Sequence, residues 1–300
     1  MSVYWNKAYV GAKESFDTTR KSASVAALIK KTTAPTEQGL ENAQRLIGAL
    51  HTSEYLKALR TGFPAKLASS NGFSWDPGIW DMAVNSTAGI LSAIDSAIED
   101  GGIHGSLSSG LHHADDTEGG GFCTVNGLAI GAIYARMEAL KNRKGVLILD
   151  FDAHCGGGTN RFLEHWNMEF VTQLDLSVSY FDEYEPRLGR NKLVVSPIGG
   201  EYLDKARTML SIAPGGYGLV LYNAGVDPYP TVSFDALAER DQMVFEHVRD
   251  WGIPCVWTLA GGYSPPFTDE MLAFAHYNTY RAAIGEQSVA GSEVVLLSED

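Results

Sequence analysis

The stretch Val146-Leu147-Ile148-Leu149-Asp150-Phe151-Asp152-Ala153-His154 joins an apolar run to three ionisable side chains. Its aliphatic residues predict a buried strand, and residues two apart on a strand point to the same face. Asp150, Asp152 and His154 should therefore line one side of the strand's carboxyl end, followed by the small residues of 155–158. Three ionisable groups on one face are costly to bury unless a cation or a pairing network receives them. The stretch predicts a metal site at the edge of a sheet.

Strand-like and helix-like segments alternate through the rest of the chain. Helices are predicted over 41–50, 55–60, 81–99, 126–140, 159–165, 201–212, 234–251 and 266–284, and strands over 105–108, 145–151, 170–174, 193–196, 218–222 and 254–259. Short apolar strands separated by helices are typical of a parallel sheet covered on both faces. We therefore expect an α/β fold of three α/β/α layers with a central, mostly parallel sheet.

The organisation of the chain favours a single domain over residues 1–300. The candidate chemistry extends from His112 to Tyr263, and no Pro/Ser-rich or charged linker interrupts that span. Residues 291–300 are expected to form a weakly anchored, flexible tail.

Composition excludes some classes of function. The formal charge of −13 argues against a nucleic-acid-binding surface, and it suits either a cationic substrate or simple solubility. The 3 cysteines include no C-x-x-C pair, so neither a disulfide framework nor a structural zinc knuckle is indicated. The N-terminus lacks an apolar leader, and no apolar run approaches membrane-spanning length. A cytoplasmic protein without a membrane partner is the expectation.

Four clusters follow predicted strands. They are His112-His113, the segment 150–154, Asn223-Ala224-Gly225-Val226-Asp227 and Ala260-Gly261-Gly262-Tyr263. Alone, a histidine pair or a Gly-Gly-Tyr is weak evidence, because buried histidines usually pack and glycines commonly occupy turns. In a parallel sheet, however, the carboxyl ends of the strands meet at one edge, where ligands bind. The four clusters together predict one site.

These motifs, with Leu111-His112-His113-Ala114, Gly121-Phe122-Cys123-Thr124-Val125-Asn126 and the segment 71–77, resemble the zinc-dependent histone deacetylase family of the arginase/deacetylase superfamily. Their order and approximate spacing match over most of the chain. The resemblance implies an arginase/deacetylase-like fold and the hydrolysis of an acyl group, acetyl above all, from an amine. The family includes histone deacetylases, acetylpolyamine amidohydrolases and small bacterial deacylases, so acyl-lysine in a protein, an acylated polyamine and another small acyl amine all remain open as substrates.

The resemblance also implies one Zn²⁺ per chain, held by Asp152, His154 and Asp227. Three protein ligands leave coordination positions open, which is typical of a catalytic zinc rather than a structural one. A structural monovalent cation such as K⁺ is implied near Asp150.

Roles for the remaining site residues follow from the same resemblance. His112 and His113 would hold the attacking water and move its proton, with Asp150 orienting the first histidine. Tyr263 would donate a hydrogen bond to the carbonyl oxygen as it becomes an oxyanion. Substrate-channel positions are Gly121, Phe122 and Gly262.

The sequence departs from the family's pattern after His154. The family usually carries an aspartate that pairs with the second histidine, and here that position is Gly157. Candidates to replace it are Asp115, Asp116 and Glu118. The second aromatic wall of the channel is open among Tyr180, Phe181 and Tyr184.

Three other interpretations compete with a zinc deacylase. An arginase-like ureohydrolase needs a further aspartate for its two-manganese site, where this chain has Gly156. A catalytically impaired acyl-amine-binding homologue is the second, because of Gly157. A structural α/β domain is the third, and it would leave four coincident motifs unexplained.

Overall fold

A parallel β-sheet forms the middle layer of the protein. The computed structural model describes residues 1–11, 17–140, 144–213 and 215–297. Its seven-stranded sheet has the order β1-β2-β7-β6-β3-β4-β5, and every neighbouring pair is parallel. The strands are β1 (Val3–Tyr4), β2 (Ile103–Ser106), β3 (Gly145–Asp150), β4 (Val171–Ser177), β5 (Lys192–Val195), β6 (Tyr217–Gly225) and β7 (Cys255–Ala260).

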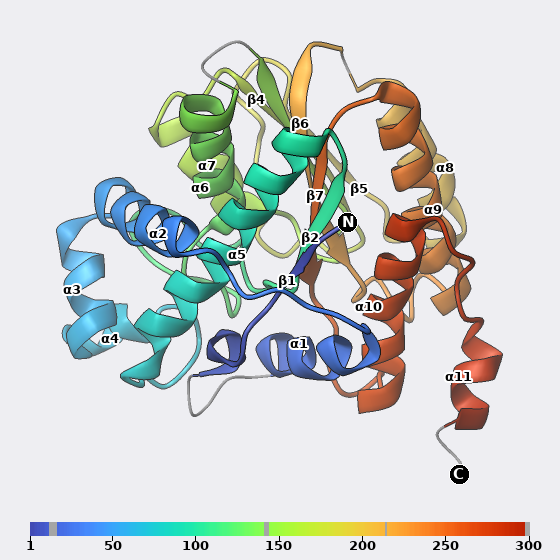
Figure 1. Cartoon of the computed structure of the whole chain (residues 1–300), viewed down its shortest axis with the longest axis horizontal. Coiled ribbons are helices and arrows are strands. Elements are labelled where there is room, and N and C mark those ends of the chain that lie inside the picture. Colours follow the sequence, from blue (N-terminus) through green and yellow to red (C-terminus); the bar gives the residue numbers. More distant parts are fainter. Residues whose placement is uncertain (12–16, 141–143, 214, 298–300) are drawn as a thin grey trace.

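Helices cover both faces of this sheet, which confirms the expected α/β/α layers (Figure 1). They are α1 (Asp17–Leu28), α2 (Glu37–Leu50), α3 (Ser53–Thr61), α4 (Ala65–Ala68), α5 (Gly78–Asp100), α6 (Gly127–Tyr134), α7 (Gly157–His165), α8 (Tyr202–Ser211), α9 (Phe234–Trp251), α10 (Asp269–Ile284) and α11 (Gly291–Leu297). Short helical turns occupy Lys7–Val10, Ala135–Ala139 and Gly199–Glu201. No helix within the described ranges is both long and apolar enough to cross a membrane.

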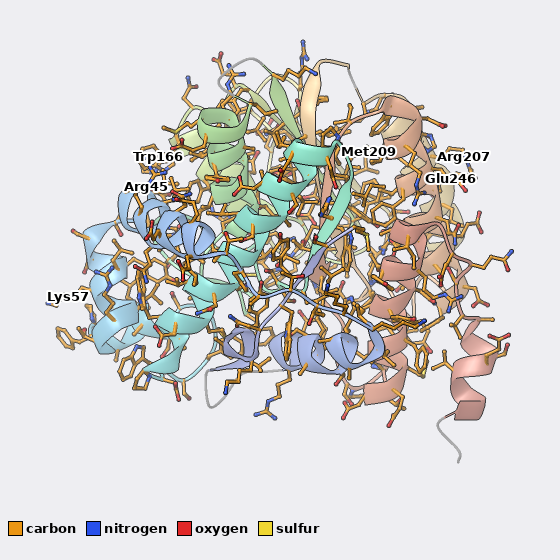
Figure 2. All side chains as sticks on the ribbon, in the orientation of Figure 1. Arg45, Lys57, Trp166, Arg207, Met209 and Glu246 are labelled. Carbon is orange, nitrogen blue, oxygen red and sulfur yellow. The ribbon has the colours of Figure 1, made fainter. Side chains whose placement is uncertain are left out.

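The alternation of side chains along β3 explains the two layers. Val146 and Ile148 pack into the core under α2, α5 and α6, whereas Leu147 and Leu149 pack into the core under α8 and α9. All four are fully buried, as expected for a strand with helices on both faces. Figure 2 shows side chains filling the space between the ribbons on both sides of the sheet.

Two differences from the sequence predictions lie at the ends of the chain. The N-terminal β1 and α1 were not expected. A two-residue strand such as β1 carries no detectable periodicity. The tail expected over 291–300 contains a helix, α11, at residues 291–297, and its flexibility stays a prediction. Asp235 accepts a hydrogen bond from the backbone N–H of Gly291 at 2.8 Å, and Val294 is buried. Residues 298–300 lie outside the described part of the chain.

The register of the central strands determines where the site forms. Asp150, at the end of β3, lies beside Asn223 of β6, and Asn223 lies beside Thr258 of β7. The segments that follow these three strands therefore leave the sheet side by side. The predicted clusters after β3, β6 and β7 all lie at this edge.

A buried histidine at the end of α2 predicts acid sensitivity. His51 is 6% exposed, packs 5.6 Å from the ring of Phe162, and donates from Nδ1 to the carbonyl of Ile47 at 3.1 Å. Burial lowers the pKa of His51 to about 4, so the folded state favours the neutral ring. This contribution to stability is complete above the unfolded-state pKa of about 6.5 and is lost as the pH falls towards 4.

We expect the free energy of unfolding to fall by about 3 kcal/mol from this group between those pH values. In His51→Gln, urea unfolding should show a correspondingly weaker dependence on pH below about 6.5. His165→Gln is the control for losing an exposed histidine. Parallel stability curves for wild type and His51→Gln would contradict the prediction.

Candidate active site

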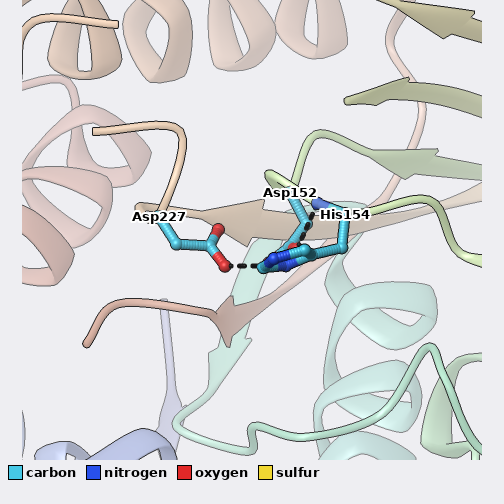
Figure 3. A group of neighbouring side chains, drawn as sticks. All are labelled: Asp152, His154 and Asp227. Carbon is cyan, nitrogen blue, oxygen red and sulfur yellow. Dashed lines mark hydrogen bonds and ion pairs between the residues drawn. The ribbon is translucent and has the colours of Figure 1, made fainter. Parts of the chain in front are cut away.

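Three side chains beyond β3 and β6 form a compact group at the edge of the sheet. Asp152, His154 and Asp227 each offer one ligand atom, and these atoms lie within 4.8 Å of one another. Nδ1 of His154 lies 3.2 Å from Oδ1 of Asp152 and 3.2 Å from Oδ2 of Asp227 (Figure 3). Among the described residues this is the one such group of histidine, cysteine or carboxylate side chains.

The electrostatics of this group fit a bound cation. Burial disfavours charge on His154, yet the carboxylates of Asp152 and Asp227 raise its pKa to about 11. Burial and the nearby Asp152 raise the pKa of Asp227, and its Oδ2 faces Nδ1 of His154 at 3.2 Å. Two carboxylate oxygens and one imidazole nitrogen are ligands that Zn²⁺ accepts in catalytic sites. The residues present therefore fit a single zinc ion.

A buried arginine of α9 ties together the strand ends that carry these ligands. Nη1 of Arg240 donates to the carbonyl of Phe151 at 2.9 Å and to that of Gly225 at 2.5 Å. Its charge is paired with Asp241, whose Oδ1 lies 2.7 Å from Nη2. Asp241 also accepts a hydrogen bond from Thr279 at 2.6 Å. Sequence reasoning missed Arg240, because nothing in a helical segment marks a side chain that reaches a strand end.

We expect Arg240→Met to lower the free energy of unfolding by about 3–5 kcal/mol, because it leaves the buried Asp241 unpaired. Urea unfolding measures this loss. Arg207→Met is the matched control, since Arg207 is exposed on α8 and its pair with Asp204 should contribute no more than about 1 kcal/mol (Figure 2). Equal free energies of unfolding for the two variants would mean that Arg240 does not stabilise the strand ends.

The tandem histidines lie beside the ligand group and each has a carboxylate partner. Nδ1 of His112 lies 3.0 Å from Oδ2 of Asp150, and Nδ1 of His113 lies 2.9 Å from Oδ2 of Asp182. Burial opposes charge on His112, but Asp150 and then Asp152 raise its pKa to about 10. Burial and the neighbouring His112 lower the pKa of His113 to about 4. The surroundings therefore shift the pKa values of the two rings in opposite directions.

The partner of His113 corrects the sequence analysis. His113 pairs with Asp182, which is none of the residues suggested to replace the carboxylate missing at Gly157. Asp115 instead pairs with Arg161 at 3.1 Å, and Asp116 with His165 at 2.7 Å. Glu118 donates its backbone N–H to Asp115. Asp182 was missed because a lone aspartate in a loop carries no spacing signal.

Aromatic rings surround the ligand group. Phe181 is the aromatic residue of the 180–184 segment that contacts the site, with ring centroids 5.0 Å from His113 and 5.6 Å from His154. Tyr180 is exposed, and Tyr184 donates instead to Asp175 at 3.2 Å. Phe122 and Tyr263 have ring centroids 6.1 Å apart, and the Tyr263 ring lies 6.4 Å from that of His154.

Backbone turns bring these side chains close. Gly121 has φ 47°, and a Cβ atom there would overlap the ring of His113, so only glycine fits this approach. Gly262 has φ 88° in the turn before Tyr263. The buried Lys21, which sequence reasoning also missed, donates to the carbonyl of Gly261 and holds this turn. Substrate contacts for Gly121, Phe122 and Gly262 stay predictions.

Both carboxylate oxygens of Asp150 have a polar partner. Its Oδ1 accepts a hydrogen bond from Asn223 at 2.8 Å, and its Oδ2 faces His112. Asp175 of β4 lies beside Asp150 in register, and burial together with Asp150 raises the pKa of Asp175. The monovalent cation expected near Asp150 stays a prediction.

Comparison with known proteins gives one consistent set of relatives. A model of the histone deacetylase domain matches residues 14–185, which is more than half of the chain. Histone deacetylase 2 of Arabidopsis thaliana is 30% identical over 169 residues, covering 52% of this chain and 43% of that protein. An uncharacterised protein of Picosynechococcus is 25% identical over 248 residues, covering 78% and 80%.

The acetylpolyamine amidohydrolase of Mycoplana ramosa is 28% identical over 213 residues, covering 63% of this chain and 60% of that protein. This chain therefore matches less than half the length of the Arabidopsis relative and well over half of the other two.

Proposed function

The chain belongs to the histone deacetylase family of the arginase/deacetylase superfamily, and from this premise we propose that it is a zinc-dependent amidohydrolase that removes an acyl group from an amine. Acetyl is the expected acyl group, and the amine is a lysine side chain, a polyamine or another small amine. The observation that carries the proposal is the juxtaposition of the Asp152, His154 and Asp227 group with two carboxylate-backed histidines.

Asp152, His154 and Asp227 would hold the zinc ion through two oxygens and one nitrogen. When bound, zinc lowers the pKa of a water to about 7 and polarises a carbonyl as a Lewis acid. Arg240 supports this chemistry indirectly, because it fixes the backbone just before Asp152 and close to Asp227.

The tandem histidines would move the proton of the attacking water. An ionised carboxylate can only accept a hydrogen bond, so Nδ1 of His113 carries a proton towards Asp182 and its other ring nitrogen has a lone pair. We assign His113 to take the proton of the water and to pass it to the leaving amine. His112, held by Asp150, would hold the water and place positive charge near the developing oxyanion. Groups in such roles contribute on the order of 10²- to 10⁴-fold.

Tyr263 would stabilise the oxyanion of the tetrahedral intermediate. Burial, followed by Asp227 and Asp152, raises the pKa of Tyr263, so the hydroxyl keeps its proton and can donate it in a hydrogen bond. Phe122 and Phe181 supply aromatic surface around the same group, which suits the methylene chain of a lysine or a polyamine.

Elemental analysis together with hydrolysis of acyl-lysine and acyl-polyamine substrates tests the proposal. The panel is run with and without a hydroxamate that chelates zinc. We expect one zinc per chain and amide cleavage that the hydroxamate abolishes. Two manganese ions per chain would favour the ureohydrolase, and bound zinc without turnover on any acyl amine would favour an acyl-amine-binding homologue. Gly157 does not favour the acyl-amine-binding homologue, because His113 pairs with the carboxylate of Asp182.

A further inference from the structure

The carboxylate of Asp182 fills the space that a side chain on residue 157 would take. A Cβ atom built on Gly157 would overlap both the carbonyl oxygen and the carboxylate of Asp182. Gly157 is the first residue of α7, whereas Asp182 lies in the loop after β4. A side chain at 157 and the present position of Asp182 therefore exclude each other. His113 receives its partner from a loop rather than from a helix.

Three donors hold this carboxylate in place. Its Oδ2 accepts hydrogen bonds from Nδ1 of His113 at 2.9 Å and from the backbone N–H of Gly158 at 3.1 Å. Its Oδ1 accepts from Nη1 of Arg161 at 2.7 Å, and Nε of Arg161 donates in turn to Asp115 at 3.1 Å. Burial opposes the charge, but the hydrogen bonds from His113 and Arg161 lower the pKa of Asp182. Arg161 thus links Asp182, the partner of His113, to the carboxylate of Asp115.

The loop that carries Asp182 also forms part of the wall of the site. Phe181, the preceding residue, places its ring against those of His113 and His154. Its carbonyl accepts a hydrogen bond from the backbone N–H of Cys155 at 3.0 Å, which ties the loop to the segment after β3. The placement of this loop therefore sets both the Phe181 wall and the carboxylate partner of His113.

We propose that Asp182, held by Arg161, is the positioning residue that keeps the His113 imidazole in its Nδ1–H form, in place of a carboxylate at position 157. The proposal rests on the deacylation proposed above, in which His113 handles the proton. Asp182 acts through His113 and does not touch the reacting atoms. Its loss should therefore lower kcat with little change in KM or zinc content.

Asp182→Asn in the zinc-loaded protein is the direct test. Asparagine tolerates the left-handed φ of 58° at this position, so the loop should keep its shape. Its single acceptor oxygen serves either His113 or Arg161, not both. We expect kcat to fall on the order of 100-fold. Glu183→Gln removes the exposed carboxylate of the next residue and is the matched control, with kcat unchanged.

Arg161→Gln is the second variant, chosen because the Arg161 side chain is 47% exposed and its loss should not prevent folding. It releases Oδ1 of Asp182, so kcat should fall less than in Asp182→Asn. The double variant should have a kcat only slightly below that of Asp182→Asn alone, because both substitutions disrupt the same linked set of hydrogen bonds.

Nitrogen-15 NMR of the histidine rings gives a readout that does not need turnover. The His113 signal is identified by its disappearance in His113→Gln, and we expect an Nδ1–H ring in wild type that changes tautomer in Asp182→Asn. An unchanged kcat and an unchanged ring spectrum in Asp182→Asn would overturn this proposal while leaving a zinc-dependent wild-type activity standing. The expected tautomer change in a protein that hydrolyses no acyl amine would support Asp182 as the positioning residue and reject the proposed function alone.

Discussion

Asp152→Ala and Asp227→Ala should each remove the bound metal and the activity together. Each substitution deletes one of the three ligand atoms that lie within 4.8 Å of one another and leaves too few to hold a catalytic zinc. Because a bound metal stabilises the transition state by several kcal/mol, turnover should fall by at least about 1000-fold. Elemental analysis and the acyl-amine assay on the same preparation measure both effects.

Asp204→Ala, at an exposed carboxylate of α8, is the control for removing one acidic side chain. Circular dichroism of all three variants separates loss of metal from loss of fold. A variant that lacks metal yet keeps full activity would exclude the ligand group from the reaction. A variant that keeps one zinc per chain would mean that the ligands lie elsewhere.

Tyr263→Phe should lower kcat by about 10²- to 10³-fold while the zinc content stays at the wild-type level, because it removes one hydrogen bond made to the oxyanion. The ring itself remains, so its packing against Phe122 and the turn held by Lys21 should persist. Steady-state kinetics on the best substrate of the panel, together with metal analysis, provide the measurement.

Tyr280→Phe is the matched control, since Tyr280 stacks on Tyr277 of α10 and should not affect kcat. Turnover of Tyr263→Phe equal to that of wild type would remove this hydroxyl from the mechanism. A parallel loss of zinc would instead show that the substitution disturbs the ligand group.

Much of this protein was readable from the sequence, because its signals are local. The aliphatic run 146–149 marked a strand buried on both faces, and the ionisable residues two apart after it marked one face of its carboxyl end. The alternation of such strands with helices predicted the α/β/α layers that the structure has. Since parallel strands end at a common edge, the clusters after β3, β6 and β7 were expected to meet, and Asp152, His154 and Asp227 do meet there.

What the sequence left open depends on contacts between distant segments. Asp182 reaches His113 across 69 residues of chain, and Arg240 reaches Phe151 across 89. A single aspartate in a loop or a single arginine in a helix follows no period and no spacing, so no pattern marks its partner. Only the packing of α7 against the loop after β4 leaves room for the Asp182 carboxylate where Gly157 has no side chain. Local periodicity determined the sheet and the edge where the candidate metal ligands meet, whereas three-dimensional packing decided which carboxylate contacts the second histidine.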